Sequence, residues 1–462
     1  MSQSFTVTNP ATGATLETLI GVTPGDAAAQ VYQAHAAFSA WRQTSPRHRA
    51  DVLMRAYQGM MDQADRLAEL IVAENGKSQV DAAAEVKYAS EFFRWYAEEA
   101  VRAPSQFGEA PAGGVRNVVI RQPVGVAVLI TPWNFPAAMA TRKIGPALAA
   151  GCAVLLKPAA ETPLTALAIA DILLESGVPE GTVQVAPTTD AAGVVSAWLA
   201  DSRVRKLSFT GSTPVGRRLL AQCADRVVNT SMELGGNAPF IVTEDAEIDA
   251  AVEGAMLAKF RNGGQACTAA NRFYVHADVV EEFTAKFGAR IEALRVGDPS
   301  QGADIGPVIT AKAAAGIRAL VEQAVEQGAQ IRHQAQLPAE AQETFVTPVL
   351  LSGVPQDADI LTQEIFGPVA PIVSYTDEEA MLRMANAAEV GLASYVYAGD
   401  LRGAMRLGER LEAGMVGINR GIVSDPAAPF GGVKQSGIGR EGGAFGIEEF
   451  TEVQYLSVDW SS

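Results

Sequence analysis

Residues 259–272 read KFRNGGQACTAANR, and the rest of this 462-residue chain can be interpreted around them. The stretch contains Cys267, one of only three cysteines, shortly after the paired glycines Gly263 and Gly264. Paired glycines lose much backbone entropy on folding, so they favour a tight turn or a close approach to a ligand. Thr268-Ala269-Ala270 then predicts the start of a helix. Cys267 would lie near its N-terminus, where the helix dipole lowers a thiol pKa and favours the nucleophilic thiolate.

A plainer interpretation of Cys267 is a buried core residue, because free cysteine is among the most buried residue types. The surrounding sequence argues against this. Seven short motifs occur along the chain: PWNFP at 132–136, KPA at 157–159, FTGS at 209–212, MELGGN at 232–237, NGGQAC at 262–267, EIFGP at 364–368 and PFGG at 429–432. Together and in this order, they resemble the signatures of the aldehyde dehydrogenase family. Within that family the chain is most similar to the succinate-semialdehyde dehydrogenases.

Length and charge narrow the class of protein. A chain of 462 residues exceeds the usual size of one hydrophobic core and predicts two or three domains. The net charge of −16 argues against binding to nucleic acid or to an anionic membrane, and an anionic substrate would need local positive groups. Three cysteines fit a reducing compartment, the first residues show no signal-peptide pattern, and prolines interrupt the most apolar region. We therefore expect a cytoplasmic protein.

Strands and helices alternate from Val126 onward, which predicts an α/β fold with parallel sheets covered by helices on both faces. Expected strands at 126–131, 152–157 and 206–210 end at or directly before Pro132, Lys157 and Gly211 of the first three motifs. Ligands bind such sheets at the carboxyl ends of the strands.

Three parts are expected in the chain. A dinucleotide-binding domain comprises residues 1–108 and 124–234 with a return segment at 431–448, and a catalytic domain comprises residues 235–430. The resemblance implies that residues 109–123 and 449–462 form a small oligomerisation element of a homodimer or homotetramer.

The resemblance implies three catalytic roles. Cys267 would add to the aldehyde carbonyl as a thiolate, and loss of hydride would leave a thioester. Glu233 would activate the water that cleaves the thioester. Its apolar, glycine-rich neighbours disfavour the alternative of a surface carboxylate. Asn134 would stabilise the oxyanion through its side-chain amide, together with the backbone N–H of Cys267.

The cofactor signal lacks a Gly-x-Gly-x-x-Gly motif. Gly211 and Ser212 follow an expected strand and open an expected helix, so their N–H groups would receive a pyrophosphate. By resemblance, Lys157 would reach the adenosine ribose and Glu364 the nicotinamide ribose. The remaining residues expected to contact the cofactor by resemblance are Trp133, Leu234 and Phe366.

Cofactor choice is expected to depend on Ala160. In NAD-preferring relatives, a glutamate three residues after the lysine matching Lys157 often holds the ribose hydroxyls and would repel a 2′-phosphate. Alanine at this place leaves room beside a positive lysine. We therefore expect NADP+ to be favoured over NAD+, although Glu161 lies next to this position.

The substrate is expected to be an anionic aldehyde. In relatives that oxidise succinate semialdehyde, residues matching Arg142, Arg261 and Ser424 grip the substrate carboxylate. Arginine also suits this task on physical grounds, because its guanidinium pairs with a carboxylate in a bidentate way. Such a clamp fixes the type of charge better than the chain length, so glutarate semialdehyde or a sulfonated aldehyde would also fit. The plainer alternative is that both arginines form structural ion pairs.

Other classes of function find less support. A cysteine hydrolase needs a nearby histidine, and the four histidines, at 35, 48, 276 and 333, lie in no matching motif. No clustered cysteines and histidines suggest a zinc enzyme, and no metal is expected. A catalytically silent structural relative of the family is one alternative. An enzyme that passes the acyl group to coenzyme A is another, because retention of Glu233 does not exclude it.

Overall fold

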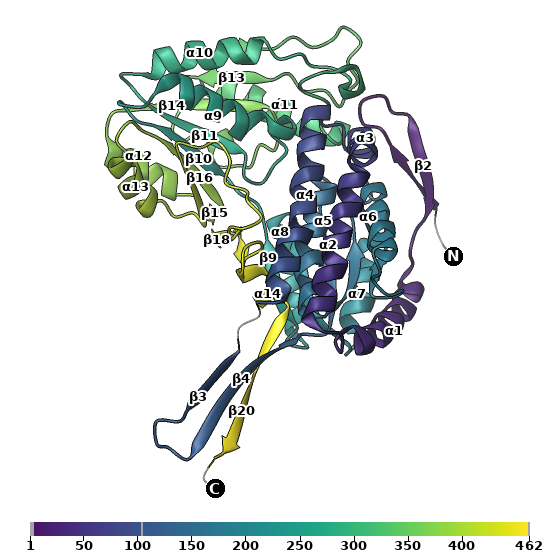
Figure 1. Cartoon of the computed structure of the whole chain (residues 1–462). Helices are drawn as coiled ribbons and strands as arrows, with labels where there is room; N and C mark the ends of the chain where they lie inside the picture. The colour runs from purple at the N-terminus through teal and green to yellow at the C-terminus, as the bar shows by residue number, and fades with distance from the viewer. Residues whose placement is uncertain (1–3, 103–104, 461–462) are drawn as a thin grey trace.

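The computed structural model describes residues 4–102 and 105–460. Two α/β bodies lie side by side, and a three-stranded sheet extends away from them (Figure 1). The chain begins with the antiparallel strands β1 (Ser4–Thr8) and β2 (Thr15–Ile20). Their turn is closed by the Gly13 N–H, which donates to Asn9 O at 2.7 Å. This is the hairpin that the turn residues in this segment predict.

Four helices follow the hairpin: α1 (Pro24–Trp41), α2 (Pro46–Asp62), α3 (Ala64–Asn75) and α4 (Gln79–Ala100). Their ends follow from local sequence. The Ser45 side chain accepts a hydrogen bond from the His48 N–H, and Pro46 occupies the first turn of α2. Gly76 ends α3 with φ of 84°, a conformation that glycine adopts readily. α4 packs lengthwise against α2 and α5, so its buried side chains reach the centre of the first body.

The first body is built on a six-stranded sheet with strand order β19-β9-β8-β5-β6-β7. All neighbours run parallel except β19, which is antiparallel to β9. The strands are β5 (Val126–Ile130), β6 (Ala153–Lys157), β7 (Val183–Val185), β8 (Val204–Thr210), β9 (Asn229–Glu233) and β19 (Gly437–Ile438). The connecting helices are α5 (Pro136–Ala150), α6 (Leu164–Glu175), α7 (Ala191–Ala200) and α8 (Thr213–Ala224). The ends of β5, β6 and β8 therefore meet at one edge.

The second body is built on a seven-stranded sheet with order β12-β13-β14-β11-β10-β16-β17, parallel except for β12. Its strands are β10 (Ala238–Val242), β11 (Ala270–His276), β12 (Gln330–Gln334), β13 (Val349–Ser352), β14 (Val369–Tyr375), β16 (Ala393–Tyr397) and β17 (Met415–Ile418). Its helices are α9 (Ile248–Phe260), α10 (Val280–Glu292), α11 (Ala311–Glu326), α12 (Glu378–Asn386) and α13 (Leu401–Arg410). Short 3-10 turns are η1 (Arg261–Gly264), η2 (Pro299–Gln301) and η3 (Asp359–Leu361).

The extending sheet joins distant parts of the chain. β20 (Thr451–Asp459) pairs antiparallel with β4 (Val115–Pro123), which pairs antiparallel with β3 (Gln106–Glu109). Near its base lie the helix α14 (Phe445–Glu448) and the small pair of β15 (Val390–Gly391) with β18 (Val433–Lys434) (Figure 1).

The predicted α/β class is confirmed by these parallel sheets, but the predicted helix behind Cys267 is wrong. Residues from Ala270 onward form β11, which pairs in parallel with β10 and β14. The run Phe273-Tyr274-Val275 is aromatic and β-branched, and its burial in the sheet outweighs the weak helical signal of two alanines. Among the described helices, none has the length and apolar character needed to cross a membrane.

Candidate active site

Cys267 lies on a tightly turned loop between α9 and β11. Asn262, Gly263 and Gly264 have φ of 53°, 60° and 77°, a run of left-handed backbone that explains the paired glycines. Gly236 approaches the loop from the end of β9: a Cβ added there would lie 2.4 Å from the carbonyl oxygen of Cys267. The loop is thus held against the first body at a place where only glycine fits.

Cys267 lines a cavity of about 250 Å³ between the two bodies. The same cavity is lined by seven more of the residues expected at the site: Trp133, Asn134, Gly211, Ser212, Leu234, Glu364 and Phe366. They come from segments far apart in the sequence, at the ends of β5, β8 and β9 and in the loop before β14. The cavity therefore brings the expected nucleophile, oxyanion donor and cofactor contacts to one place.

The thiol does not have the low pKa expected from a helix N-terminus. Burial raises the pKa of Cys267 to about 12, and the carboxylates of Glu364 and Glu233 add to this shift. Arg142 and Arg261 act in the opposite direction. In this state the sulfur is a thiol, so a proton must leave before it acts as a nucleophile.

Two N–H donors are available beside the sulfur. Asn134 is buried, and its side-chain Nδ2 donates to Gln265 O at 3.1 Å. Its Oδ1 has no hydrogen-bond partner among the described residues. The backbone N–H of Cys267 likewise donates to no acceptor in the described part of the chain. An oxyanion formed next to the sulfur would find these two donors already in place.

Glu233 is the last residue of β9 and is not among the residues that line the cavity. Its Oε2 is buried without a hydrogen-bond partner among the described residues. A Cβ added to Gly431 would lie 2.8 Å from its Oε1, so this glycine leaves room for the carboxyl group. Burial, followed by the negative charge of Glu441, raises the pKa of Glu233 well above its usual value, while Lys143 and Arg142 oppose that shift. A carboxyl group of this kind is poised to act as a base once it loses its proton.

Sequence reasoning missed the charged group that surrounds Glu233. Lys143 Nζ donates to Glu441 Oε1 and, at 2.9 Å, to Ser208 Oγ. Lys143 and Glu441 are buried and lie 298 residues apart in the chain. Glu441 stands in the glycine-rich return segment and Lys143 follows the PWNFP motif, but no local pattern shows that the two meet.

A second cavity, of about 580 Å³, adjoins the first and shares Pro132, Thr210, Gly211 and Ser212 with it. Lys157 and Ala160 line its far part. Ser212 precedes α8 without a side-chain hydrogen bond to the helix end. Pro214 has no N–H, and the N–H groups of Val215 and Gly216 donate to Ser212 O, so among the described residues the N–H groups of Ser212 and Thr213 remain for an anion. The Gly211 N–H itself is engaged, because it donates to Glu233 O at 3.0 Å. Next to Cys267, the rings of Trp133 and Phe366 lie 5.5 Å apart, nearly perpendicular. These residues fit an extended dinucleotide whose redox end lies near the sulfur.

The three residues of the expected clamp differ in their surroundings. Arg142 is buried, and its guanidinium donates to Tyr88 Oη at 2.7 Å and lies 3.6 Å from Glu441 Oε2. Arg261 is half-buried, lies 5.1 Å from the ring centre of Phe135, and has no ion pair or hydrogen bond among the described residues. Both arginines act electrostatically on Cys267. Ser424 is half-buried and makes no hydrogen bond to either arginine.

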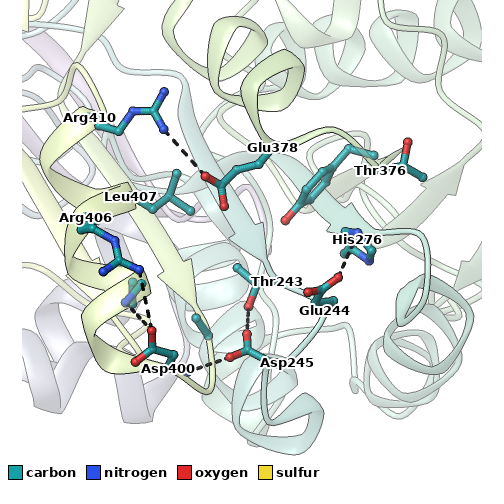
Figure 2. A pocket seen from close by; sticks show the side chains of 14 residues that line it. Thr243, Glu244, Asp245, His276, Thr376, Glu378, Asp400, Arg406, Leu407 and Arg410 are labelled. Carbon is teal, nitrogen blue, oxygen red and sulfur yellow. Dashed lines mark hydrogen bonds and ion pairs between the residues drawn. The ribbon is translucent and has the colours of Figure 1, made fainter.

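Another cavity, of about 400 Å³, lies at the carboxyl edge of the second sheet (Figure 2). Its charged side chains pair with one another, as in Arg410 with Glu378 at 3.7 Å and Arg406 with Asp400 at 3.9 Å. It contains none of the residues expected at the site. The charged side chains that line this cavity thus neutralise one another.

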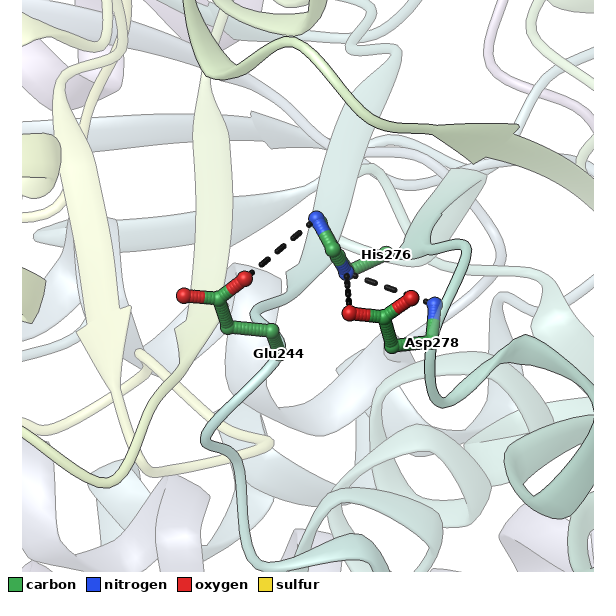
Figure 3. A group of neighbouring side chains, drawn as sticks. All are labelled: Glu244, His276 and Asp278. Carbon is green, nitrogen blue, oxygen red and sulfur yellow. Dashed lines mark hydrogen bonds and ion pairs between the residues drawn. The ribbon is translucent and has the colours of Figure 1, made fainter.

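His276 at the rim of that cavity forms a group with Glu244 and Asp278, whose possible metal ligands lie within 4.8 Å of one another (Figure 3). Glu244 lies 3.6 Å from Nε2, whereas Asp278 lies 3.7 Å from Nδ1. The carboxylates thus face different nitrogens of one ring and do not converge on a common point. The geometry is that of a histidine paired with two exposed carboxylates.

Several known proteins are similar to this chain along nearly its full length. The model of a family described as "Aldehyde dehydrogenase family" matches residues 1–456. A succinate-semialdehyde dehydrogenase of Paenarthrobacter nicotinovorans is 49% identical over 446 residues, covering 96% of this chain and 98% of that protein. A glutarate-semialdehyde dehydrogenase of Pseudomonas putida is 44% identical, covering 99% and 94%. The crystal structure of an Escherichia coli NADP-dependent enzyme superposes with a TM-score of 0.97 at 44% identity, covering 99% and 95%.

Proposed function

Because the chain belongs to the aldehyde dehydrogenase family, we propose that it oxidises succinate semialdehyde, or a similar short aldehyde bearing an anionic group, to the corresponding acid. The observation that carries this proposal is the cavity of Cys267, in which a nucleophile, an oxyanion donor and an apolar wall for a nicotinamide meet. The relatives named above act on aldehydes of this kind.

The chain's own residues divide the reaction between them. Cys267 loses its proton and adds to the aldehyde carbonyl, and the oxyanion of the thiohemiacetal accepts hydrogen bonds from Asn134 Nδ2 and the Cys267 N–H. NAD(P)+, when bound along Lys157, α8 and Glu364, supplies the acceptor for the hydride. The thioester that remains on Cys267 is cleaved by water. Glu233 takes the proton of that water after its side chain turns toward the sulfur.

Arg261 supports an anionic substrate more directly than Arg142. In a protein of net charge −16, a half-buried guanidinium without an ion-pair partner attracts a carboxylate. Arg142 already donates to Tyr88 and pairs with Glu441, so it would add positive charge near the substrate carboxylate without contacting it directly. Ser424 would complete the clamp with its hydroxyl group.

We expect kcat/KM for succinate semialdehyde to exceed that for uncharged butanal by at least roughly 100-fold, as expected for one charge-assisted contact of about 2–3 kcal/mol. Arg261→Ala should remove most of this margin and largely spare butanal. Both aldehydes would be measured by reduced-cofactor absorbance, with Arg295→Ala as control, since Arg295 pairs with Asp304 on the exposed surface. An Arg261→Ala enzyme that keeps its preference would show that the clamp is misplaced.

Two other outcomes would redirect the substrate proposal. A higher kcat/KM for glutarate semialdehyde or a sulfonated aldehyde would keep the anionic clamp and change its ligand. Faster steady-state turnover on addition of coenzyme A would identify an acyl-transferring enzyme instead of a hydrolytic one.

NADP+ is the favoured cofactor in this proposal. Ala160 carries no carboxylate that would repel a 2′-phosphate, and Lys157 lies in the same cavity. Arg218, on α8, lines this cavity as well and has no ion pair or hydrogen bond among the described residues. Glu161, which also lines the cavity, weakens but does not cancel the positive charge of the two cations.

We expect Arg218→Gln to lower kcat/KM for NADP+ by roughly tenfold, about 1.4 kcal/mol, with little effect on NAD+. The adjacent Arg217 is the matched control, because it does not line the cavity and donates instead to Gln435. Equal losses with both cofactors would remove Arg218 from the phosphate site. A wild-type preference for NAD+ would overturn the proposed cofactor choice itself.

The three-stranded sheet is proposed to join copies of the chain in a cytoplasmic homodimer or homotetramer. Its exposed apolar side chains include Phe107, Val453 and Tyr455, which are 67%, 62% and 56% exposed. Apolar surface of this kind on an extending sheet favours a partner. Light scattering that gives the mass of a single chain at micromolar concentration would contradict this assignment.

A further inference from the structure

We propose that the buried ion pair of Lys77 and Glu85 positions Asn134, and that these two side chains thereby set the rate at which the thiohemiacetal forms. The inference rests on the oxyanion role proposed above for Asn134. Neither side chain reaches the cavity of Cys267, so each acts as a positioning residue through the loop that it holds.

Lys77 lies between α3 and α4 and is fully enclosed, with its side chain 0% exposed. Its Nζ lies 2.5 Å from Glu85 Oε2 and donates to the backbone oxygen of Asn134 at 2.8 Å. It also lies 3.9 Å from the ring centre of Phe135. A single buried ammonium group therefore contacts two consecutive residues of the PWNFP motif.

Glu85 holds the other side of the same loop. Its Oε1 accepts from the N–H groups of Ala137 at 2.9 Å and Ala138 at 3.2 Å, in the first turn of α5. These N–H groups have no acceptor within their own helix, so the carboxylate supplies one. Its negative charge also interacts favourably with the positive end of the helix dipole. The carbonyl group of Asn134 and the helix start that follows it are thus tied to one ion pair.

The same face of α4 also reaches the nucleophile loop. Asp81, four residues before Glu85, accepts from the N–H of Asn262 at 2.8 Å. The side-chain Nδ2 of Asn262 donates to the backbone oxygen of Asn134 at 2.8 Å, beside Lys77. Asn134 comes from the first body and Cys267 from the second. A single helix face therefore fixes the oxyanion donor relative to the nucleophile.

A second buried carboxylate shows what is special about Glu85. Glu74 accepts from the N–H groups of Leu164 at 2.8 Å and Thr165 at 2.9 Å, at the start of α6. Glu74 thus also caps a helix of the first body, but it has no lysine partner among the described residues and its side chain makes no hydrogen bond to Asn134. Both carboxylates are buried, and each caps the start of a helix. They differ because the helix capped by Glu85 follows directly after the loop of Asn134, whereas the helix capped by Glu74 does not.

The test is a double-mutant cycle on the burst of reduced cofactor, which reports formation and oxidation of the thiohemiacetal. We expect Lys77→Met to slow the burst by roughly 10- to 50-fold and Asn134→Ala by roughly 100-fold. In the Asn134→Ala background, Lys77→Met should cost less than about twofold more, because the two changes remove one function. If the two single slowing factors multiply in the double variant, the proposal is overturned.

Two further readouts separate positioning from general damage. Cofactor affinity, followed by tryptophan fluorescence, and alkylation of Cys267 by iodoacetamide should stay within about twofold of wild type in Lys77→Met. Glu85→Gln should slow the burst, whereas Glu74→Gln should lower the melting temperature and leave the burst unchanged. Equal slowing by both Gln variants would make the effect one of helix capping alone.

Lys77→Met leaves Glu85 buried without its partner and can impair folding. The double variant Lys77→Met/Glu85→Gln removes both charges and keeps an acceptor for the α5 N–H groups. We expect it to fold and to keep the slow burst; a wild-type burst would overturn the proposal. Any aldehyde that gives a burst serves here, so failure with succinate semialdehyde would fall on the substrate proposal only. An unchanged burst in Asn134→Ala would refute the oxyanion role together with this inference.

Discussion

Cys267→Ala is expected to abolish aldehyde oxidation, with a loss of at least about 10⁴-fold in kcat, while the protein still binds its cofactor. The loss is large because no other thiol lines the cavity: the remaining cysteines, Cys152 and Cys223, are buried elsewhere. Removing a catalytic nucleophile typically costs several orders of magnitude. Cofactor binding should persist because Lys157 and the start of α8 lie in the adjoining cavity.

The measurement combines absorbance at 340 nm with fluorescence titration of the cofactor. Cys152→Ala is the matched control, since its sulfur is buried at the start of β6, where it donates to Phe450 O at 3.3 Å. That variant should lose some stability and keep its turnover. Substantial oxidation by Cys267→Ala would remove the covalent mechanism, and loss of cofactor binding would show that the substitution disturbs more than the nucleophile.

The edge of the first sheet could be predicted from the sequence because its signals are local. Pro132 and Gly211 follow shortly after the ends of β5 and β8, and Lys157 ends β6. Strands that run parallel bring their carboxyl ends to one edge, so three separate motifs predicted one shared cavity. The structure places residues of all three in the cavity expected to hold the adenosine.

The helix predicted behind Cys267 failed for a physical reason. Two alanines after a turn give a weak local preference, whereas residues 270–276 gain burial between two neighbouring strands. Contacts across the sheet decided the conformation. The expected source of a low thiol pKa is therefore absent, and the proton of Cys267 has to be removed by other means.

The charged residues around the site could not be predicted because their partners are distant in sequence. Lys143 and Glu441 are 298 positions apart, and Lys77 reaches Asn134 across 57 positions. Read locally, Lys77 and Glu85 resemble ordinary charges near a helix start. Only the packing of α4 against α5 shows that both are buried against the PWNFP loop.

The pH dependence of turnover is expected to follow from Glu233. Its pKa is raised by burial and by the charge of Glu441, so this carboxyl group loses its proton at a higher pH than an ordinary glutamate does. A base acts only after losing its proton, and the active fraction therefore grows as pH rises. We expect the steady-state rate to rise with pH beyond the range in which an ordinary glutamate titrates. The pKa of Cys267, raised to about 12, acts in the same direction through neutral and mildly alkaline pH.

Glu233→Gln should separate the two halves of the reaction. Glutamine keeps the size of the side chain beneath Gly431 and cannot accept the proton of water. We expect a burst of about one reduced cofactor per active site, then a steady-state rate lowered by roughly 10²- to 10⁴-fold, the range for loss of a general base. The acyl group should remain on Cys267, where intact-protein mass spectrometry would detect it. A steady-state rate like that of wild type would assign the base to another residue. A missing burst would mean that Glu233 acts before the thioester, by removing the thiol proton. That result would also explain how a thiol with a raised pKa, on a loop before a strand rather than at the start of a helix, becomes a nucleophile.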